Sequence, residues 1–216
     1  MLTKYLSRIF LPPIENVIWQ RPENGRNLYL TFDDGPQPYV TPAVLEILNS
    51  AKIPAVFFLS GMQLEKYEKD LPKLDYNSHE IANHGFSHTP CNLQSTLQVV
   101  REIEKTDHLI KRIFNRSTRL FRPPYGIWDG GLEKALKEQH KTMILWSLLS
   151  NDFKWPVSKI LDFLAVHIEP GDIIVFHDSE QSSSTIVKVL PEFIDLALKM
   201  DFQFKSLHPL NGFGKS

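Results

Sequence analysis

The segment NLYLTFDDGP, residues 27–36, indicates the kind of fold that this chain adopts. Its first six residues are mostly apolar and β-prone, so they predict a strand, and Asp33 and Asp34 follow where that strand ends. The Gly-Pro pair that completes the segment predicts a tight turn. An isolated Asp-Asp-Gly is usually a solvated turn. The segment therefore points to a functional site only if other strands bring polar side chains to the same place.

Outward from this segment, β-rich runs alternate with helical patterns in both halves of the chain. Thr41-Pro42 predicts the start of a helix, with Thr41 as the capping residue. Further strands are predicted at 55–60, 79–82, near 120, 143–149, 172–178 and 202–207, and helices at 41–48, 63–76, 95–114, 132–139, 158–167 and 185–200. This alternation favours parallel strands joined by helical crossovers, closed or partly closed into a barrel.

The composition is that of a globular protein with one core. The 216 residues contain 42% hydrophobic and 23% charged residues and no repeat or linker, so we expect one domain over 1–216 with residues 1–26 as an N-terminal arm. A net charge of -1 gives no electrostatic reason to bind nucleic acid. The single cysteine, Cys91, cannot form an intrachain disulfide, and we expect a small buried residue rather than a metal ligand.

The first residues carry no recognisable targeting signal. Their apolar stretch is interrupted by Arg8 and by Pro12-Pro13, and no small-residue cleavage site follows. No window approaches the roughly 20 apolar residues of a transmembrane span. We therefore expect a cytoplasmic protein, or one peripheral to the membrane through residues such as Tyr5 and Phe10, rather than a secreted one.

Polar and titratable side chains follow five of the predicted strands. They are Asp33 and Asp34, His84 and His88, Arg122 and Tyr125, Asp152, and His177. The carboxyl ends of parallel strands meet at one face of such a fold, and active sites are built there. We therefore expect these side chains to form one site.

Two of these groups suggest particular chemistry. On one helical turn the rings of His84 and His88 would share a face, and two imidazoles with one aspartate leave coordination positions open for water and substrate. A histidine pair alone is more often a surface or core feature, but the adjacent aspartates strengthen the metal interpretation. His177 ends an apolar strand, where we expect a general acid rather than a core histidine. The remaining histidines are expected to be structural or solvent-facing: His79, His108, His140, His167 and His208.

Four motifs in order resemble the polysaccharide deacetylase family, also called the NodB-homology domain or carbohydrate esterase family 4. They are Thr31–Pro36, Asn83–His88, Arg122–Gly126 and Val175–Asp178. The resemblance extends from about residue 28 to residue 207, and four motifs with suitable strand context are a specific signal. It implies an α/β fold of the NodB-like kind, a distorted, incomplete (β/α) barrel of about seven parallel strands with outer helices.

The resemblance also implies a bound metal. Asp34, His84 and His88 would hold a divalent cation, zinc most often, with cobalt and nickel as alternatives. The substrate would be a carbohydrate that carries N-acetylated amino sugars. We expect its contacts to come from Pro124, Tyr125, Phe153 and Val175.

The implied reaction is hydrolysis of N-acetyl groups from an amino-sugar polymer or oligosaccharide, with release of acetate. Asp33 would be the general base, and Arg122 beside it would favour its ionised form. His177 would be the general acid, and the backbone N–H of Tyr125 would donate to the developing oxyanion.

Three positions depart from the family pattern. Leu149 stands where relatives carry an acid that orients the catalytic histidine, with Asp152 and Asp178 as acids that could take over that role. Phe153 replaces a tryptophan, and Gly85 replaces a serine or threonine. The loss at Leu149 motivates an alternative, a non-catalytic carbohydrate-binding protein on the same fold. A third hypothesis is a different metal-dependent C–N hydrolase that acts on a cyclic amide or a small acetylated amine.

Overall fold

The computed structural model describes residues 14–21 and 25–207, so the rest of the expected N-terminal arm and His208 lie outside the described residues. The strands are β1 (Val17–Ile18), β2 (Asn27–Asp33), β3 (Ala55–Leu59), β4 (Glu80–Asn83), β5 (Leu120–Phe121), β6 (Thr142–Ile144), β7 (Leu148–Leu149), β8 (Ile173–His177) and β9 (Gln203–Phe204). The α-helices are α2 (Thr41–Ala51), α3 (Gly61–Tyr67), α4 (Thr96–Phe114), α5 (Gly130–Glu138), α6 (Val157–His167) and α7 (Ser183–Lys199). None of these described helices combines the length and the apolar character needed to cross a membrane.

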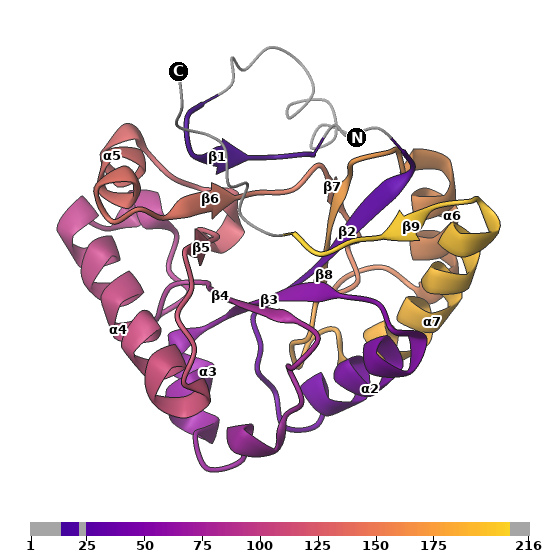
Figure 1. The fold of residues 1–216 in the computed structure, drawn as a ribbon, viewed down its shortest axis with the longest axis horizontal. Helices are drawn as coiled ribbons and strands as arrows, with labels where there is room; N and C mark the ends of the chain where they lie inside the picture. The colour runs from indigo at the N-terminus through magenta and orange to yellow at the C-terminus, as the bar shows by residue number, and fades with distance from the viewer. Residues whose placement is uncertain (1–13, 22–24, 208–216) are drawn as a thin grey trace.

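One curled parallel sheet forms the centre of the molecule, with the helices around its outside (Figure 1). Within the described residues the strand order is β1-β6-β5-β4-β3-β2-β8-β7, and β9 pairs with β2. The pairings between these strands are parallel. The expected α/β fold, a distorted and incomplete barrel, is confirmed.

The single strand predicted at 143–149 is wrong, and the reason explains how the sheet curls. β6 and β7 lie near opposite ends of the strand order, although only Leu145, Trp146 and Ser147 separate them in sequence. The N–H of Leu145 donates to Ile18 O at 2.8 Å, and the N–H of Ser147 donates to Ile173 O at 3.1 Å. The chain thus leaves one end of the sheet and enters the other, which brings the two ends together. We call these three residues the seam.

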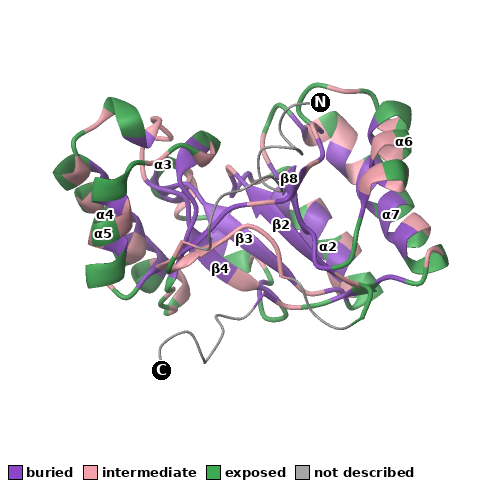
Figure 2. Cartoon of the chain, turned by 90° about the horizontal axis from the view of Figure 1, so that it is seen from above, coloured by how far each residue is buried: buried purple, intermediate pink, exposed green. Residues whose placement is uncertain are grey.

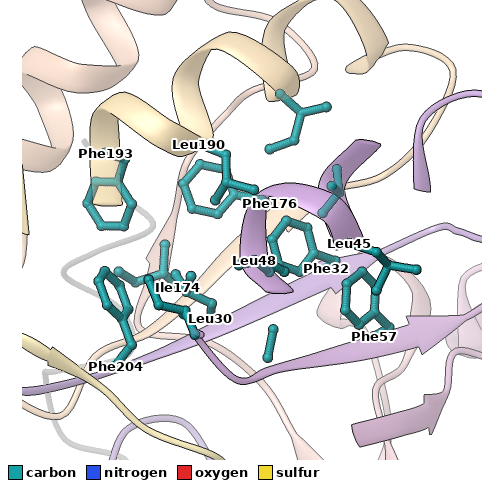
Figure 3. Close-up of a cluster of buried hydrophobic side chains, with 14 of the residues drawn as sticks. Leu30, Phe32, Leu45, Leu48, Phe57, Ile174, Phe176, Leu190, Phe193 and Phe204 are labelled. Carbon is teal, nitrogen blue, oxygen red and sulfur yellow. The ribbon is translucent and has the colours of Figure 1, made fainter. Parts of the chain in front are cut away.

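The side chains of β2 alternate between two environments, as strand geometry requires. Leu28, Leu30 and Phe32 join the large cluster between the sheet and helices α2, α6 and α7, whereas Tyr29 belongs to a second cluster on the other face. Figure 3 shows the large cluster, in which the Phe32 and Phe57 rings lie 4.9 Å apart. Figure 2 shows that the sheet is buried and that the helices expose their outer faces. Each fully buried side chain of this kind contributes roughly 1.5–3 kcal/mol. β2 is therefore a firmly held support for Asp33.

Two helix boundaries differ from the sequence predictions. The N-cap of α2 is Val40, and Thr41 occupies the first turn. The Thr41 hydroxyl instead accepts a hydrogen bond from the N–H of Gln37 at 2.7 Å and donates one to the Asp178 carboxylate. The helix predicted at 63–76 ends at Tyr67, and a separate 3-10 turn follows. In contrast, the predicted start of α4 is confirmed by a capping box in which Ser95 and Gln98 bond reciprocally.

Candidate active site

Asp34, His84 and His88 come together at the carboxyl ends of β2 and β4. Their ligand atoms lie within 4.8 Å of one another. His88 Nε2 is 2.8 Å from Asp34 Oδ1, and His84 Nε2 is 3.5 Å from the same oxygen. The expected helical turn between the two histidines is wrong, because they lie in a loop after β4 where Gly85 and His88 have positive φ angles of 73° and 57°. The loop nevertheless places the two ring centroids 5.3 Å apart.

These three side chains suit a divalent metal. Asp34 Oδ1 is buried, and its near polar neighbours are the Nε2 atoms of the two histidines, both of which are metal-ligating atoms. Burial acts to raise the pKa of Asp34, but the imidazoles of His84 and His88 outweigh it and hold that pKa well below its ordinary value. His84 Nδ1 lies 2.8 Å from the carbonyl oxygen of Arg122, which can only accept, so Nδ1 carries a proton, and in the neutral ring Nε2 has its lone pair free for a metal. One carboxylate oxygen and two imidazole nitrogens are a donor set typical of zinc sites.

Asp33 lies beside this group in a buried ion pair. Its Oδ1 is 2.6 Å from Arg122 Nη1, and its Oδ2 is 4.0 Å from His84 Nε2. The predicted proximity of Arg122 to Asp33 is confirmed. Asp33 Oδ1 is thus held by the arginine, while the residue also lines the cleft described below.

Arg122 is fully buried and held on every side. Besides Asp33, its guanidinium donates to Thr31 Oγ1 at 2.9 Å, to Ile144 O at 3.0 Å and to Leu145 O at 2.9 Å. The Arg122 Cζ atom lies 4.0 Å from the centroid of the Phe58 ring. The charge is thus paired and hydrogen-bonded, as burial of an ion demands.

His177, at the end of β8, is oriented by Asp152. Asp152 Oδ1 is 2.7 Å from His177 Nδ1, and Asp152 Oδ2 accepts from the backbone N–H of His177 at 2.8 Å. Burial acts to lower the pKa of His177, but the hydrogen bond and charge of Asp152, with smaller contributions from Asp33 and Asp34, raise it to about 9. The imidazole is therefore held protonated near neutral pH.

This pair shows which acid lies beside His177 in a chain that has Leu149 where relatives are expected to carry an acid. Leu149 lines the cleft as an apolar wall, and Asp152, three residues later, supplies the acid that orients the histidine. Ser150 Oγ donates to Asp152 Oδ1 at 3.0 Å and helps to fix it. Asp178 points elsewhere, since its carboxylate accepts from Thr41.

A cleft of about 630 Å³ connects these groups. Tyr125, Phe153 and Val175 line it, while their contacts with substrate stay predictions, and Phe153 stands edge-on to His177 with ring centroids 5.0 Å apart. Pro124 is buried and does not line the cleft, so its contact with substrate stays a prediction. Several further residues line the cleft, although no sequence pattern marked them as site residues: Gln37, Ser60, Met62, Gln63, Ser87, Trp146, Ser179, Glu180 and Gln181. Ser60 and Ser179 follow strand ends, a position that could have identified them.

The residues expected to have no role in the site mostly lie away from it. Cys91 is buried in an apolar cluster with Val99 and Ile103, and burial raises the pKa of its thiol to about 12. His79 is buried, its Nε2 lies 3.1 Å from Asn49 Oδ1, and burial lowers its pKa to about 4. Neither residue lines the cleft.

Comparisons with known proteins agree with this geometry. The family model described as polysaccharide deacetylase matches residues 20–144. A peptidoglycan-N-acetylglucosamine deacetylase of Bacillus cereus is 28% identical over 208 residues, covering 95% of this chain and 97% of the relative. A chitooligosaccharide deacetylase of Sinorhizobium fredii is 34% identical over 158 residues, covering 70% of this chain and 72% of the relative.

Solved structures show the same relationship. The crystal structure of a peptidoglycan N-acetylglucosamine deacetylase matches with a TM-score of 0.85 at 25% identity, covering 94% of this chain and 93% of the other. A pseudoenzyme of carbohydrate esterase family 4 from Bacillus anthracis matches with a TM-score of 0.82 at 22% identity, covering 91% of this chain and 68% of the other, a likeness of fold alone. The chain belongs to the polysaccharide deacetylase family.

Proposed function

We propose that this protein is a metal-dependent deacetylase that hydrolyses N-acetyl groups of an amino-sugar polymer or oligosaccharide and releases acetate. The observation that carries the proposal is the convergence of three groups on one cleft. They are the Asp34–His84–His88 cluster, the Asp33–Arg122 ion pair and the Asp152–His177 pair. A binding protein needs none of these as a set.

The metal would be held by Asp34 Oδ1 and by the Nε2 atoms of His84 and His88, and we propose zinc. Bound there, a divalent cation lowers the pKa of a water molecule and polarises a carbonyl oxygen. The position of the lone pair on His84 Nε2, set by the Arg122 carbonyl, supports this assignment. Cobalt and nickel accept the same ligands and are the alternatives to test.

The chain's own residues would carry the proton transfers. Asp33 takes a proton from the attacking water, and Arg122 holds the carboxylate in place and balances its charge. His177 Nε2 gives a proton to the departing amine nitrogen, a role supported by its raised pKa of about 9 and by its contact with Asp152. The N–H of Tyr125 would donate to the oxyanion, a contribution of roughly 2.7–4 kcal/mol for a preorganised donor.

The substrate we propose contains N-acetylglucosamine, because the chain is similar over most of its length to a peptidoglycan-N-acetylglucosamine deacetylase and to a chitooligosaccharide deacetylase. The cleft volume of about 630 Å³ lies within the roughly 300–1,000 Å³ of ligand sites. Its aromatic walls, Tyr125, Trp146 and Phe153, suit the apolar faces of sugar rings.

Acetate release from N-acetylglucosamine oligomers and from peptidoglycan, with zinc, cobalt or nickel added, tests the proposal. Asp33→Asn should lower kcat roughly 10²–10⁴-fold while the bound metal remains. The exposed Asp70→Asn serves as the matched control and should retain full activity. A fully active Asp33→Asn protein would overturn the assignment of the base.

A second candidate function is non-catalytic glycan binding, because a pseudoenzyme has the same fold. Glycan binding without acetate release in the presence of each metal would favour it. Acetate or amine release only from small acetylated amines or cyclic amides would instead favour a different C–N hydrolase.

A further inference from the structure

The loop that joins His84 to His88 is held in an unusual backbone conformation. Its φ angle is 73° at Gly85 and 57° at His88. Positive φ is uncommon for a residue with a side chain and costs of order 1–3 kcal/mol. The loop has no helical hydrogen bonds of its own. Contacts from outside the loop must therefore hold it in the conformation that brings the two imidazoles together.

A carboxylate on helix α4 supplies such contacts. Glu102 Oε2 accepts hydrogen bonds from the backbone N–H groups of Phe86 at 3.3 Å and Ser87 at 3.1 Å. Glu102 Oε1 accepts from the Ser87 hydroxyl at 2.6 Å. Hydrogen bonds to an ionised group are roughly twice as strong as neutral ones. One side chain thus binds three donors in the two residues that precede His88.

The next turn of the same helix face adds neighbouring contacts. Thr106 Oγ1 donates to Gly85 O at 3.0 Å, and Lys105 Nζ lies 3.4 Å from the centroid of the Phe86 ring. Positions three and four residues beyond Glu102 share its face of the helix. Helix α4 therefore contacts three successive loop residues between the histidines.

We propose that Glu102 is a positioning residue of the metal centre. Its carboxylate fixes the loop so that His84 and His88 present both Nε2 atoms towards Asp34. This inference rests on the proposed metal-dependent function. At Gly85 the family resemblance leads one to expect a hydroxyl, and a Cβ there would lie 3.8 Å from the same Glu102 carboxylate, whose hydroxyl partner in this chain is Ser87.

Zinc affinity of the metal-free protein tests the proposal, measured by competition with a chromophoric chelator. Glu102→Ala should weaken zinc binding roughly 10–100-fold, the range typical of partners that orient metal ligands. The matched control is Glu104→Ala on the same helix, since Glu104 is exposed and its carboxylate contacts Gln139 instead. This control should bind zinc as the wild type does.

The possible results separate the two proposals. A wild-type protein that binds no zinc, cobalt or nickel would overturn the metal-dependent function. A wild-type protein that binds zinc, with folded Glu102→Ala binding equally well, would overturn only the role of Glu102. A merely structural glutamate would lower the urea midpoint without changing the zinc affinity.

Glu102→Gln keeps the inference testable if the alanine variant fails to fold. The amide has nearly the same shape and keeps one acceptor oxygen, but it loses the charge and one acceptor. We expect a smaller loss of zinc affinity than for alanine. Wild-type affinity in a folded Glu102→Gln protein, checked by circular dichroism, would contradict the proposal.

Discussion

The charge of Asp152 raises the pKa of His177, and the variant Asp152→Asn removes that charge together with one of the two oxygens that accept from His177. An asparagine can keep its oxygen as the acceptor for the ring N–H, which lies 2.7 Å from Asp152 Oδ1, but it removes the negative charge and turns its NH2 group towards the backbone N–H of His177, a loss that does not depend on pH. Burial, which opposes the charged imidazole, would then act with much less compensation. We expect the pKa of His177 to fall from about 9 towards its ordinary value of 6.5.

The size of the effect follows from these two pKa values. The difference between 6.5 and about 9 corresponds to roughly 3 kcal/mol in favour of the imidazolium. Because the pKa of His177 is higher in the folded protein than in the unfolded chain, this stabilisation is fully present below pH 6.5 and is lost as the pH rises through 9. Metal-free wild type should therefore be more stable than Asp152→Asn by up to roughly 3 kcal/mol at pH 6. At pH 10 this contribution should be lost, which leaves only the pH-independent cost of the changed hydrogen bond.

Two measurements on metal-free protein check this reasoning. Nuclear magnetic resonance titration of the ring carbons reports the pKa of His177, and urea unfolding at pH 6 and pH 10 reports the stability difference. Asp162→Asn, at an exposed position of α6, is the matched control. Two results would refute a raised His177 pKa caused by the Asp152 charge. One is titration of His177 at the same pH in wild type and Asp152→Asn, and the other is a stability difference that does not depend on pH.

Three further outcomes are expected. His88→Ala should abolish stoichiometric metal binding, as measured by elemental analysis after dialysis, because one of three ligands is lost; full occupancy would contradict the ligand assignment. Gly85→Ser should cost roughly 1–3 kcal/mol in urea unfolding, because its φ of 73° strains any side chain; unchanged stability would mean that the loop adopts another conformation. Thr41→Val should cost roughly 1–3 kcal/mol, because the buried Asp178 carboxylate loses its hydroxyl partner, whereas Thr41→Ser should stay close to wild type.

The sequence predicted the placement of the site well because strand ends follow from simple patterns. The apolar runs that end at Asp33, before His84 and at His177 mark three strands of one parallel sheet, and their carboxyl ends must meet. The proximity of Arg122 to Asp33 came from the family resemblance and is confirmed by the ion pair.

Features that depend on local backbone handedness or on a change of strand partner were not predictable in the same way. A spacing of four residues suggested a helical turn for His84 and His88, but positive φ angles produce the same proximity in a loop. The apolar run at 143–149 looked like one strand, because hydrophobicity does not show that a chain leaves one strand neighbour for another. With Leu149 in place of an acid, the sequence left both Asp152 and Asp178 as candidates to orient His177, because the choice between them depends on side-chain direction.

The seam gives Arg122 a second role. The same guanidinium that contacts Asp33 also donates hydrogen bonds to the carbonyl oxygens of Ile144 and Leu145, where the chain crosses between the two ends of the sheet. A lysine at this position would bring a single ammonium with no planar fork, so it could not reach all of these acceptors. The proposed support of the base Asp33 and the closure of the barrel would thus both depend on one side chain. We therefore expect that a relative without deacetylase activity would still carry an arginine at the position of Arg122, because barrel closure would still need it.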